Sequence, residues 1–176
     1  EDAVDGYRYL LEHCRKIAVA GDSAGAGLAV AMLVRLRELG LPQPASGVLF
    51  SPWTDMTISA GSYGRNAERD PVLNRDLMLF LAEQYLGDRP RETALASPVF
   101  ADLHGIAPLN IFVGATEALL DDSIALARAA TLADVRVRVE IWPKMFHFWP
   151  NYYQELAEGR QAVNMAGDIL REAMLN

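Results

Sequence analysis

A serine hydroxyl stands in a setting where it could act as a nucleophile, within the segment Gly21-Asp22-Ser23-Ala24-Gly25. An apolar run leads into it and an apolar helix pattern follows, the strand–turn–helix context in which Gly-x-Ser-x-Gly forms a nucleophile elbow. Gly21 and Gly25 suit this turn, because bulk there would clash as strand and helix close on each other. The adjoining helix N-terminus favours negative charge. These features suit acyl transfer, although glycines and alanines also surround serines in turns that only pack tightly.

Composition and charge exclude several classes of function. The chain has 176 residues, enough for one domain with a proper core. It has 16 basic and 23 acidic residues, and this net charge of −7 without a basic patch argues against nucleic-acid binding. No apolar run reaches the roughly 20 residues that span a bilayer, and no signal peptide opens the chain, so a cytoplasmic location is the default expectation. Cys14 is the only cysteine; we expect a buried structural thiol and no cysteine-based metal site.

Hydrophobic periodicity predicts alternating strands and helices, and therefore a mostly parallel sheet with helices on both faces. The expected elements are helix 2–14, strand 16–20, helix 23–39, strand 47–50, helix 75–86, strand 110–113, helix 123–133, strand 135–141 and helix 152–174. The last strand alternates apolar and charged residues, so we expect it near a sheet edge. In such sheets ligands bind at the carboxyl ends of the strands, so residues just past each strand are candidates for the chemistry.

An acid and a histidine follow the serine, each just past a predicted strand. Glu117 follows strand 110–113 and His147 follows strand 135–141. A hydroxyl is a weak nucleophile at neutral pH, so a base must take its proton, and histidine titrates in the useful range. A lone histidine among aromatic residues is more often structural, but the position after the last strand favours catalysis. The order serine, acid, histidine is that of the α/β-hydrolases.

The chain as a whole resembles the C-terminal part of a hormone-sensitive-lipase-like carboxylesterase, in the bacterial branch (family IV) of the α/β-hydrolases. The resemblance lies in Gly21-Asp22-Ser23-Ala24-Gly25, Ser51-Pro52-Trp53-Thr54-Asp55, Asp70-Pro71-Val72-Leu73, Ser97-Pro98 with Pro108, Glu117-Ala118-Leu119-Leu120-Asp121 and Met145-Phe146-His147-Phe148. It implies a partial α/β-hydrolase fold. Residues 1–176 would then form the C-terminal part of a single catalytic domain, whose N-terminal strands and cap helices are absent from the sequence.

The resemblance also implies roles for individual residues. Ser23 would be the nucleophile, and His147 the base that later protonates the leaving alcohol. Glu117 stands where the family usually has aspartate and would hold the imidazole; Asp121, the motif's second acid, is the alternative unless it only caps the next helix. The N–H of Ala24 would be one oxyanion donor. The His-Gly-Gly-Gly loop that normally supplies the others does not occur in the 176 residues, and losing one donor costs about 10²–10³ in rate.

Three aromatic residues near the catalytic end are candidate walls of a substrate pocket, Trp53, Phe148 and Trp149. We expect a serine carboxylesterase that hydrolyses small to medium acyl esters through an acyl-enzyme intermediate, without a metal or organic cofactor. An amide or formamide hydrolase on the same scaffold is one alternative. A catalytically silent fragment or ligand-binding protein is another, which the missing glycine-rich loop keeps open. The sequence leaves the oligomeric state open, a homo-oligomer included.

Overall fold

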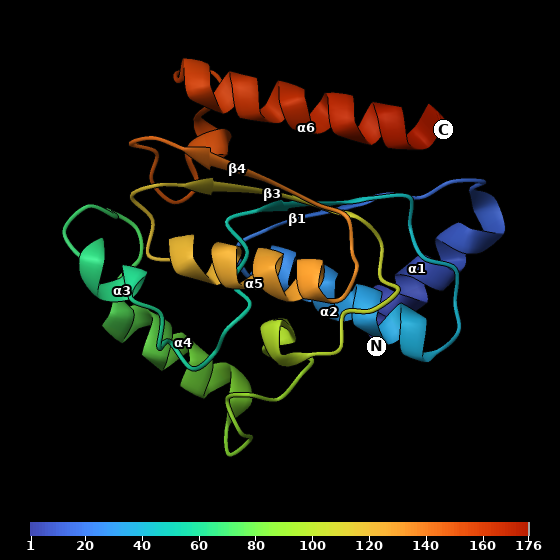
Figure 1. Cartoon of the computed structure of the whole chain (residues 1–176), viewed down its shortest axis with the longest axis horizontal. Coiled ribbons are helices and arrows are strands. Elements are labelled where there is room, and N and C mark those ends of the chain that lie inside the picture. Colours follow the sequence, from blue (N-terminus) through green and yellow to red (C-terminus); the bar gives the residue numbers. More distant parts are fainter. Residues whose placement is uncertain (176) are drawn as a thin grey trace.

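A parallel sheet of four strands forms the centre of the computed structural model, which describes residues 1–175 (Figure 1). The strands are β1 (Val19–Asp22), β2 (Gly47–Phe50), β3 (Leu109–Gly114) and β4 (Val137–Trp142). They lie side by side in chain order, and Gly47 pairs with Val19 on one side and with Leu109 on the other. β3 and β4 pair in the same parallel sense. The carboxyl ends of all four strands therefore meet at one edge of the sheet.

Helices cover both faces of this sheet. The helices of the described part of the chain are α1 (Asp2–His13), α2 (Ala24–Glu38), α3 (Ser62–Arg65), α4 (Arg75–Leu86), α5 (Leu120–Leu132) and α6 (Ala157–Leu175), with the 3-10 helices η1 (Pro98–Phe100) and η2 (Trp149–Tyr152). In Figure 1, α6 lies above the sheet, and α2 and α5 lie below it. Because side chains alternate between the faces of a strand, Val48 and Phe112 pack beneath α6, whereas Leu49 and Ile111 pack against α2 and α5. The predicted α/β fold is confirmed.

Local capping sets some of the helix ends. Asn74 precedes α4, and its side chain accepts a hydrogen bond from the Leu77 N–H at 2.9 Å. This helix spans the expected residues 75–86. α2 ends at Glu38, and Gly40 just beyond it has a φ of 65°, which favours glycine.

Other boundaries differ from the prediction because they depend on pairing across the fold. β1 pairs with β2 only from Val19 onward, and it continues to Asp22 rather than ending near residue 20. Ser23 therefore follows the strand directly. The last helix starts at Ala157 instead of 152, because Tyr152 belongs to η2 and residues 153–155 form a turn. β4 does lie at an edge of the sheet, as expected.

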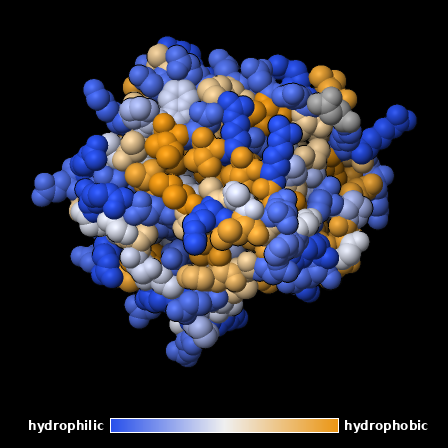
Figure 2. All heavy atoms as spheres, viewed as in Figure 1, coloured by the Kyte–Doolittle hydropathy of each residue, from blue (hydrophilic) through white to orange (hydrophobic). Residues whose placement is uncertain are grey.

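Part of the apolar surface is exposed. Figure 2 shows apolar atoms gathered near the middle of the face seen in Figure 1, where β4 and α5 lie. Ile141 of β4 is 46% exposed and Leu132 of α5 is 68% exposed. On α4, Met78 is buried, but Phe80 and Tyr85 are 56% and 63% exposed. Within residues 1–175, these side chains have no element packed over them that would remove them from water.

The exposure of Cys14 and the character of the helices bear on two expectations, a buried thiol and the absence of a membrane-spanning segment. Cys14 is exposed, so the expectation of a buried thiol is wrong. It occupies the C-cap of α1, where the chain has already left the helix in an extended conformation. None of the helices in the described part of the chain combines the length and apolar character needed to cross a membrane.

Candidate active site

Ser23 alone makes the turn between β1 and α2. Its φ of 55° and ψ of −119° lie outside the regions that non-glycine residues normally adopt, a strain of about 1–3 kcal/mol. Hydrogen bonds hold the turn: the Ser23 N–H donates to the Phe50 carbonyl at 2.9 Å, and the Trp53 N–H donates to the Ser23 carbonyl at 3.1 Å. The geometry is that of the nucleophile elbow predicted from the sequence.

Two glycines allow this turn to close. A Cβ on Gly21 would overlap the Gly25 carbonyl, so the expected steric reason for Gly21 is confirmed. A Cβ on Gly25 itself would meet nothing within 4 Å, so the same reason is wrong for Gly25. Sequence reasoning overlooked Gly27, where a Cβ would overlap the Trp53 carbonyl. That contact depends on the loop after β2, which the local motif does not reveal.

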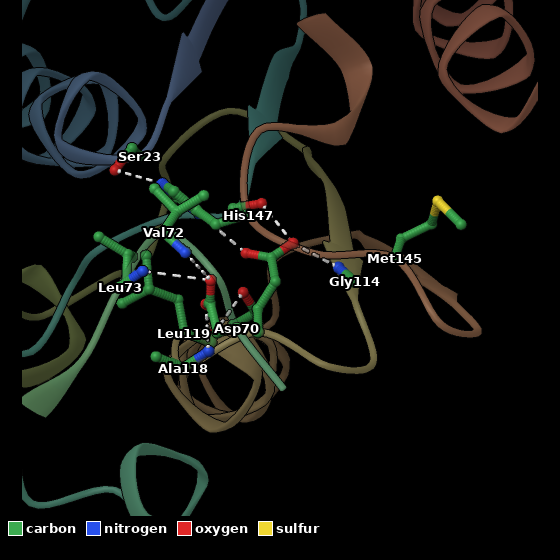
Figure 3. A network of polar contacts seen from close by, with 12 residues as sticks. Ser23, Asp70, Val72, Leu73, Gly114, Ala118, Leu119, Met145 and His147 are labelled. Carbon is green, nitrogen blue, oxygen red and sulfur yellow. Dashed lines mark hydrogen bonds and ion pairs between the residues drawn. The ribbon is translucent and has the colours of Figure 1, made fainter. Parts of the chain in front are cut away.

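His147 bridges the serine and an acid (Figure 3). Its Nε2 lies 3.0 Å from Ser23 Oγ, and its Nδ1 lies 2.9 Å from Glu117 Oε2. The three residues follow β1, β3 and β4, and the sheet brings their side chains together at its carboxyl edge. With the ring proton on Nδ1, the imidazole donates to the carboxylate, and Nε2 is free to accept the serine proton. His147 and Glu117 are fully buried, whereas Ser23 is partly exposed.

Glu117 is held by more than the histidine. Its Oε1 accepts hydrogen bonds from the Gly114 N–H at 2.6 Å and from Ser51 Oγ at 2.8 Å, which leaves Oε2 for His147. Burial raises the pKa of Glu117, and the hydrogen bonds from His147, Gly114 and Ser51 oppose that shift because they favour the carboxylate. Sequence reasoning did not assign a role to Ser51. It follows β2 directly, so the rule about strand ends was the signal that could have identified it.

The carboxylate of Asp121, the alternative acid, has other partners. Its Oδ2 accepts from the Ser62 N–H at 2.9 Å, and its Oδ1 forms an ion pair with Arg65 at 2.6 Å. The Nδ1 atom of His147 is bonded to Glu117 instead. The expectation that Asp121 caps the next helix is wrong, because α5 already begins at Leu120.

The remaining expected site residues occupy different environments. Ala24 is exposed at the first position of α2, where helix N–H groups have no partner within the helix. Phe148 is partly buried and meets the His147 ring edge-on, with ring centroids 4.6 Å apart. Trp53 is buried in the loop after β2. Trp149 is fully buried with Phe112 beneath α6, which makes it a core residue instead of the pocket wall expected.

A cavity of about 390 Å³ lies at the opposite edge of the sheet from Ser23. Its lining includes Lys16, Pro108 and Arg136, which precede β1, β3 and β4. This position is remote from the Ser23–His147 pair, so the cavity does not belong to the candidate active site. In the part of the chain that the structure covers, no three His, Cys, Asp or Glu side chains come together as potential metal ligands.

A second buried acid, Asp122, lies in the first turn of α5, close to Asp55 and Tyr63. Both of its carboxyl oxygens are buried without a hydrogen bond of standard geometry within residues 1–175. Burial and the charge of Asp55 raise its pKa well above the ordinary value, while the nearby backbone of Thr54 and the Tyr63 hydroxyl oppose the shift without reversing it. The folded state therefore holds a proton on Asp122 at a pH where the unfolded state has lost it.

We expect Asp122→Asn to change the pH dependence of stability. In the unmodified protein, the contribution of Asp122 is fully present below the unfolded pKa of about 3.9 and is lost as the pH rises through the raised folded value. Asparagine has no such proton to lose. The variant's Tm minus that of the unmodified protein should therefore grow as the pH rises from 4 to 8 in thermal unfolding. A constant difference across that range would contradict the raised pKa.

Similar sequences are found among α/β-hydrolases and esterases. The family model described as the alpha/beta hydrolase fold matches residues 1–151. An acetyl-hydrolase from Streptomyces hygroscopicus is 46% identical over 176 residues, covering 98% of this chain and 59% of the relative. An esterase from Acinetobacter venetianus is 33% identical over 168 residues, covering 92% of this chain and 55% of the relative.

Solved structures of esterases also superpose closely on this chain. An esterase from the bacterial hormone-sensitive lipase family superposes with a TM-score of 0.96 at 44% identity, covering 98% of this chain and 59% of that protein. An esterase/lipase from an uncultured bacterium superposes with a TM-score of 0.95 at 42% identity. The chain spans 59% of the length of the Streptomyces relative and 60% of that second structure. By these matches, the chain belongs to the α/β-hydrolase fold family, in its hormone-sensitive-lipase-like branch.

Proposed function

We propose that the protein is a serine carboxylesterase in which Ser23 is the nucleophile, His147 the general base and Glu117 the acid of the triad. The observation that carries this proposal is the unbroken line of contacts from Ser23 Oγ through His147 to Glu117, at 3.0 and 2.9 Å. Such a line lets the imidazole take the serine proton while the carboxylate stabilises the resulting imidazolium. The relatives are named as an acetyl-hydrolase and an esterase, which favours an ester as substrate.

The reaction would run in two halves. In the first, Ser23 Oγ attacks the ester carbonyl carbon and gives its proton to Nε2 of His147. The imidazolium then protonates the leaving alcohol as the carbon–oxygen bond breaks, which leaves an acyl-serine. In the second half, water attacks the acyl carbon and gives a proton to His147, and the acid is released as the proton returns to Ser23. The N–H of Ala24 would donate to the oxyanion in both halves.

We also propose that residues 1–176 are the C-terminal part of a single catalytic domain. The chain matches only 59% of the length of its Streptomyces relative. β1 carries the elbow, yet it pairs with one strand only within residues 1–175, so its other edge is open to a further strand. The exposed Phe80 and Tyr85 of α4 are apolar surface that a further element could cover.

One assay series tests substrate and completeness together. The full-length protein means the complete polypeptide to which residues 1–176 belong. It should hydrolyse p-nitrophenyl acetate and butyrate faster than p-nitrophenyl palmitate, because a small to medium acyl group is the expected substrate. Residues 1–176 alone should be slower by at least about 10²-fold, the typical cost of one missing oxyanion donor.

Two results would contradict these proposals separately. Turnover of p-nitroacetanilide as fast as that of the matching ester would favour an amidase over an esterase. Full activity of residues 1–176 alone would overturn the proposal that they are part of a larger catalytic domain.

A further inference from the structure

Residues 62–73, a segment that begins with α3, hydrogen-bond to the loop that carries Glu117. The side-chain Nδ2 of Asn66 donates to the Glu117 carbonyl oxygen at 2.8 Å. The Oδ2 atom of Asp70 accepts from the Ala118 N–H, also at 2.8 Å, and Figure 3 shows this contact as a dashed line. These two backbone atoms belong to one peptide unit. Both polar atoms of the peptide bond that follows Glu117 are therefore held by the same segment.

We propose that Asn66 and Asp70 are positioning residues, which fix the orientation of Glu117 toward His147. This inference rests on the proposed role of Glu117 as the acid of the triad. Within residues 1–175, neither side chain hydrogen-bonds to Ser23 or His147. They would act only through the backbone of the loop.

Both side chains are themselves fixed by further hydrogen bonds. The second oxygen of Asp70, Oδ1, accepts from the N–H groups of Val72 at 3.0 Å and Leu73 at 3.2 Å. The Oδ1 atom of Asn66 accepts from Arg69 at 3.1 Å. A side chain with all its polar atoms engaged cannot change rotamer without breaking several bonds. The two residues therefore form a rigid support instead of an adaptable contact.

Burial strengthens this support. Asn66 is 1% exposed and Asp70 is 6% exposed, and Ala118 lies in an apolar cluster with Tyr63. A hydrogen bond in such surroundings is stronger than in water, and an unpaired peptide group there is costly. The Glu117 carbonyl has one other backbone donor, at the longer distance of 3.4 Å. Asn66 therefore supplies its main partner.

Glu117 has particular need of such support. A glutamate has three rotatable side-chain bonds, one more than an aspartate, so its carboxylate can reach more positions from a given backbone. Its peptide unit lies before α5, which begins at Leu120, so the helix does not fix its orientation. A misplacement of about 1 Å in a catalytic group can cost about 10²-fold in rate.

The test uses Asn66→Asp and Asp70→Asn in the full-length protein. Each keeps the size of the side chain. Asn66→Asp removes the donor to the Glu117 carbonyl. Asp70→Asn leaves one acceptor oxygen where Ala118, Val72 and Leu73 N–H groups had two. We expect kcat for p-nitrophenyl acetate to fall by about 10- to 100-fold, with KM changed by less than about threefold. Arg65→Ala is the matched control, because it removes a different contact of the same segment, the ion pair between Arg65 and Asp121. This variant should leave kcat within about threefold of the unmodified value.

A double-mutant cycle separates positioning from a purely structural role. If Asn66 and Asp70 act through Glu117, their substitution should lower kcat by less than about threefold once Glu117→Gln is present. Equal losses in both backgrounds, or no loss in either, would overturn the inference. The two variants test it independently if one fails to fold, which thermal unfolding would reveal. If Glu117→Gln alone left kcat unchanged, the proposed acid itself would be wrong, a failure distinct from an absence of coupling.

Discussion

Alanine in place of Ser23 is expected to lower kcat for p-nitrophenyl acetate by about 10⁶-fold in the full-length protein, because no other group would form the acyl intermediate. Ser23 is partly exposed, and within residues 1–175 its hydroxyl has one side-chain hydrogen-bond partner, Nε2 of His147 at 3.0 Å. Its removal should therefore leave the fold intact. Steady-state kinetics at high enzyme concentration, together with thermal unfolding, measure the two effects separately.

His147→Ala serves as the matching variant for this prediction. Residues that act as one unit give losses that do not add, so the double variant with Ser23→Ala should be about as inactive as either single variant. Activity of Ser23→Ala within tenfold of the unmodified protein would contradict the assignment of the nucleophile.

Glu117→Gln is expected to lower kcat by about 10⁴-fold. A carboxamide of the same size can stabilise the wrong tautomer of His147 and cannot balance the charge of the imidazolium. The measurement is kcat as a function of pH for the two proteins.

Asp121→Asn is the control for that variant. The Asp121 carboxylate is bonded to Ser62 and Arg65, so its loss should change kcat by less than about threefold. A larger effect from Asp121→Asn than from Glu117→Gln would transfer the role of the acid to Asp121.

The local parts of the site could be predicted from the sequence. The elbow around Ser23 is a contiguous motif, and the positions of Glu117 and His147 follow from the rule that functional residues lie just past parallel strands. The helix 75–86 could be predicted from the periodicity of its apolar residues, and its start is set locally by the hydrogen bond from Leu77 N–H to Asn74, three residues away. These signals are short in sequence, so no knowledge of the tertiary fold is needed to recognise them.

The other features depend on contacts between distant residues. Ser51 reaches Glu117 across 66 positions, and Asn66 reaches the same residue across 51. Trp149 is aromatic and close to His147 in sequence, but the packing of α6 over the sheet buries it in the core. The periodicity of a single segment contains no information about such partners. The burial of Trp149 and the support of Glu117 therefore emerged only from the structure.

Covalent labelling tests the central proposal most directly. The full-length protein would be treated with a fluorophosphonate, which phosphonylates an activated serine, and the site would be identified by peptide mass spectrometry. A single adduct on Ser23 is predicted, formed much more slowly in His147→Ala and absent in Ser23→Ala. An unlabelled protein, or an adduct on any other serine, would contradict the account of Ser23 as a nucleophile activated by His147.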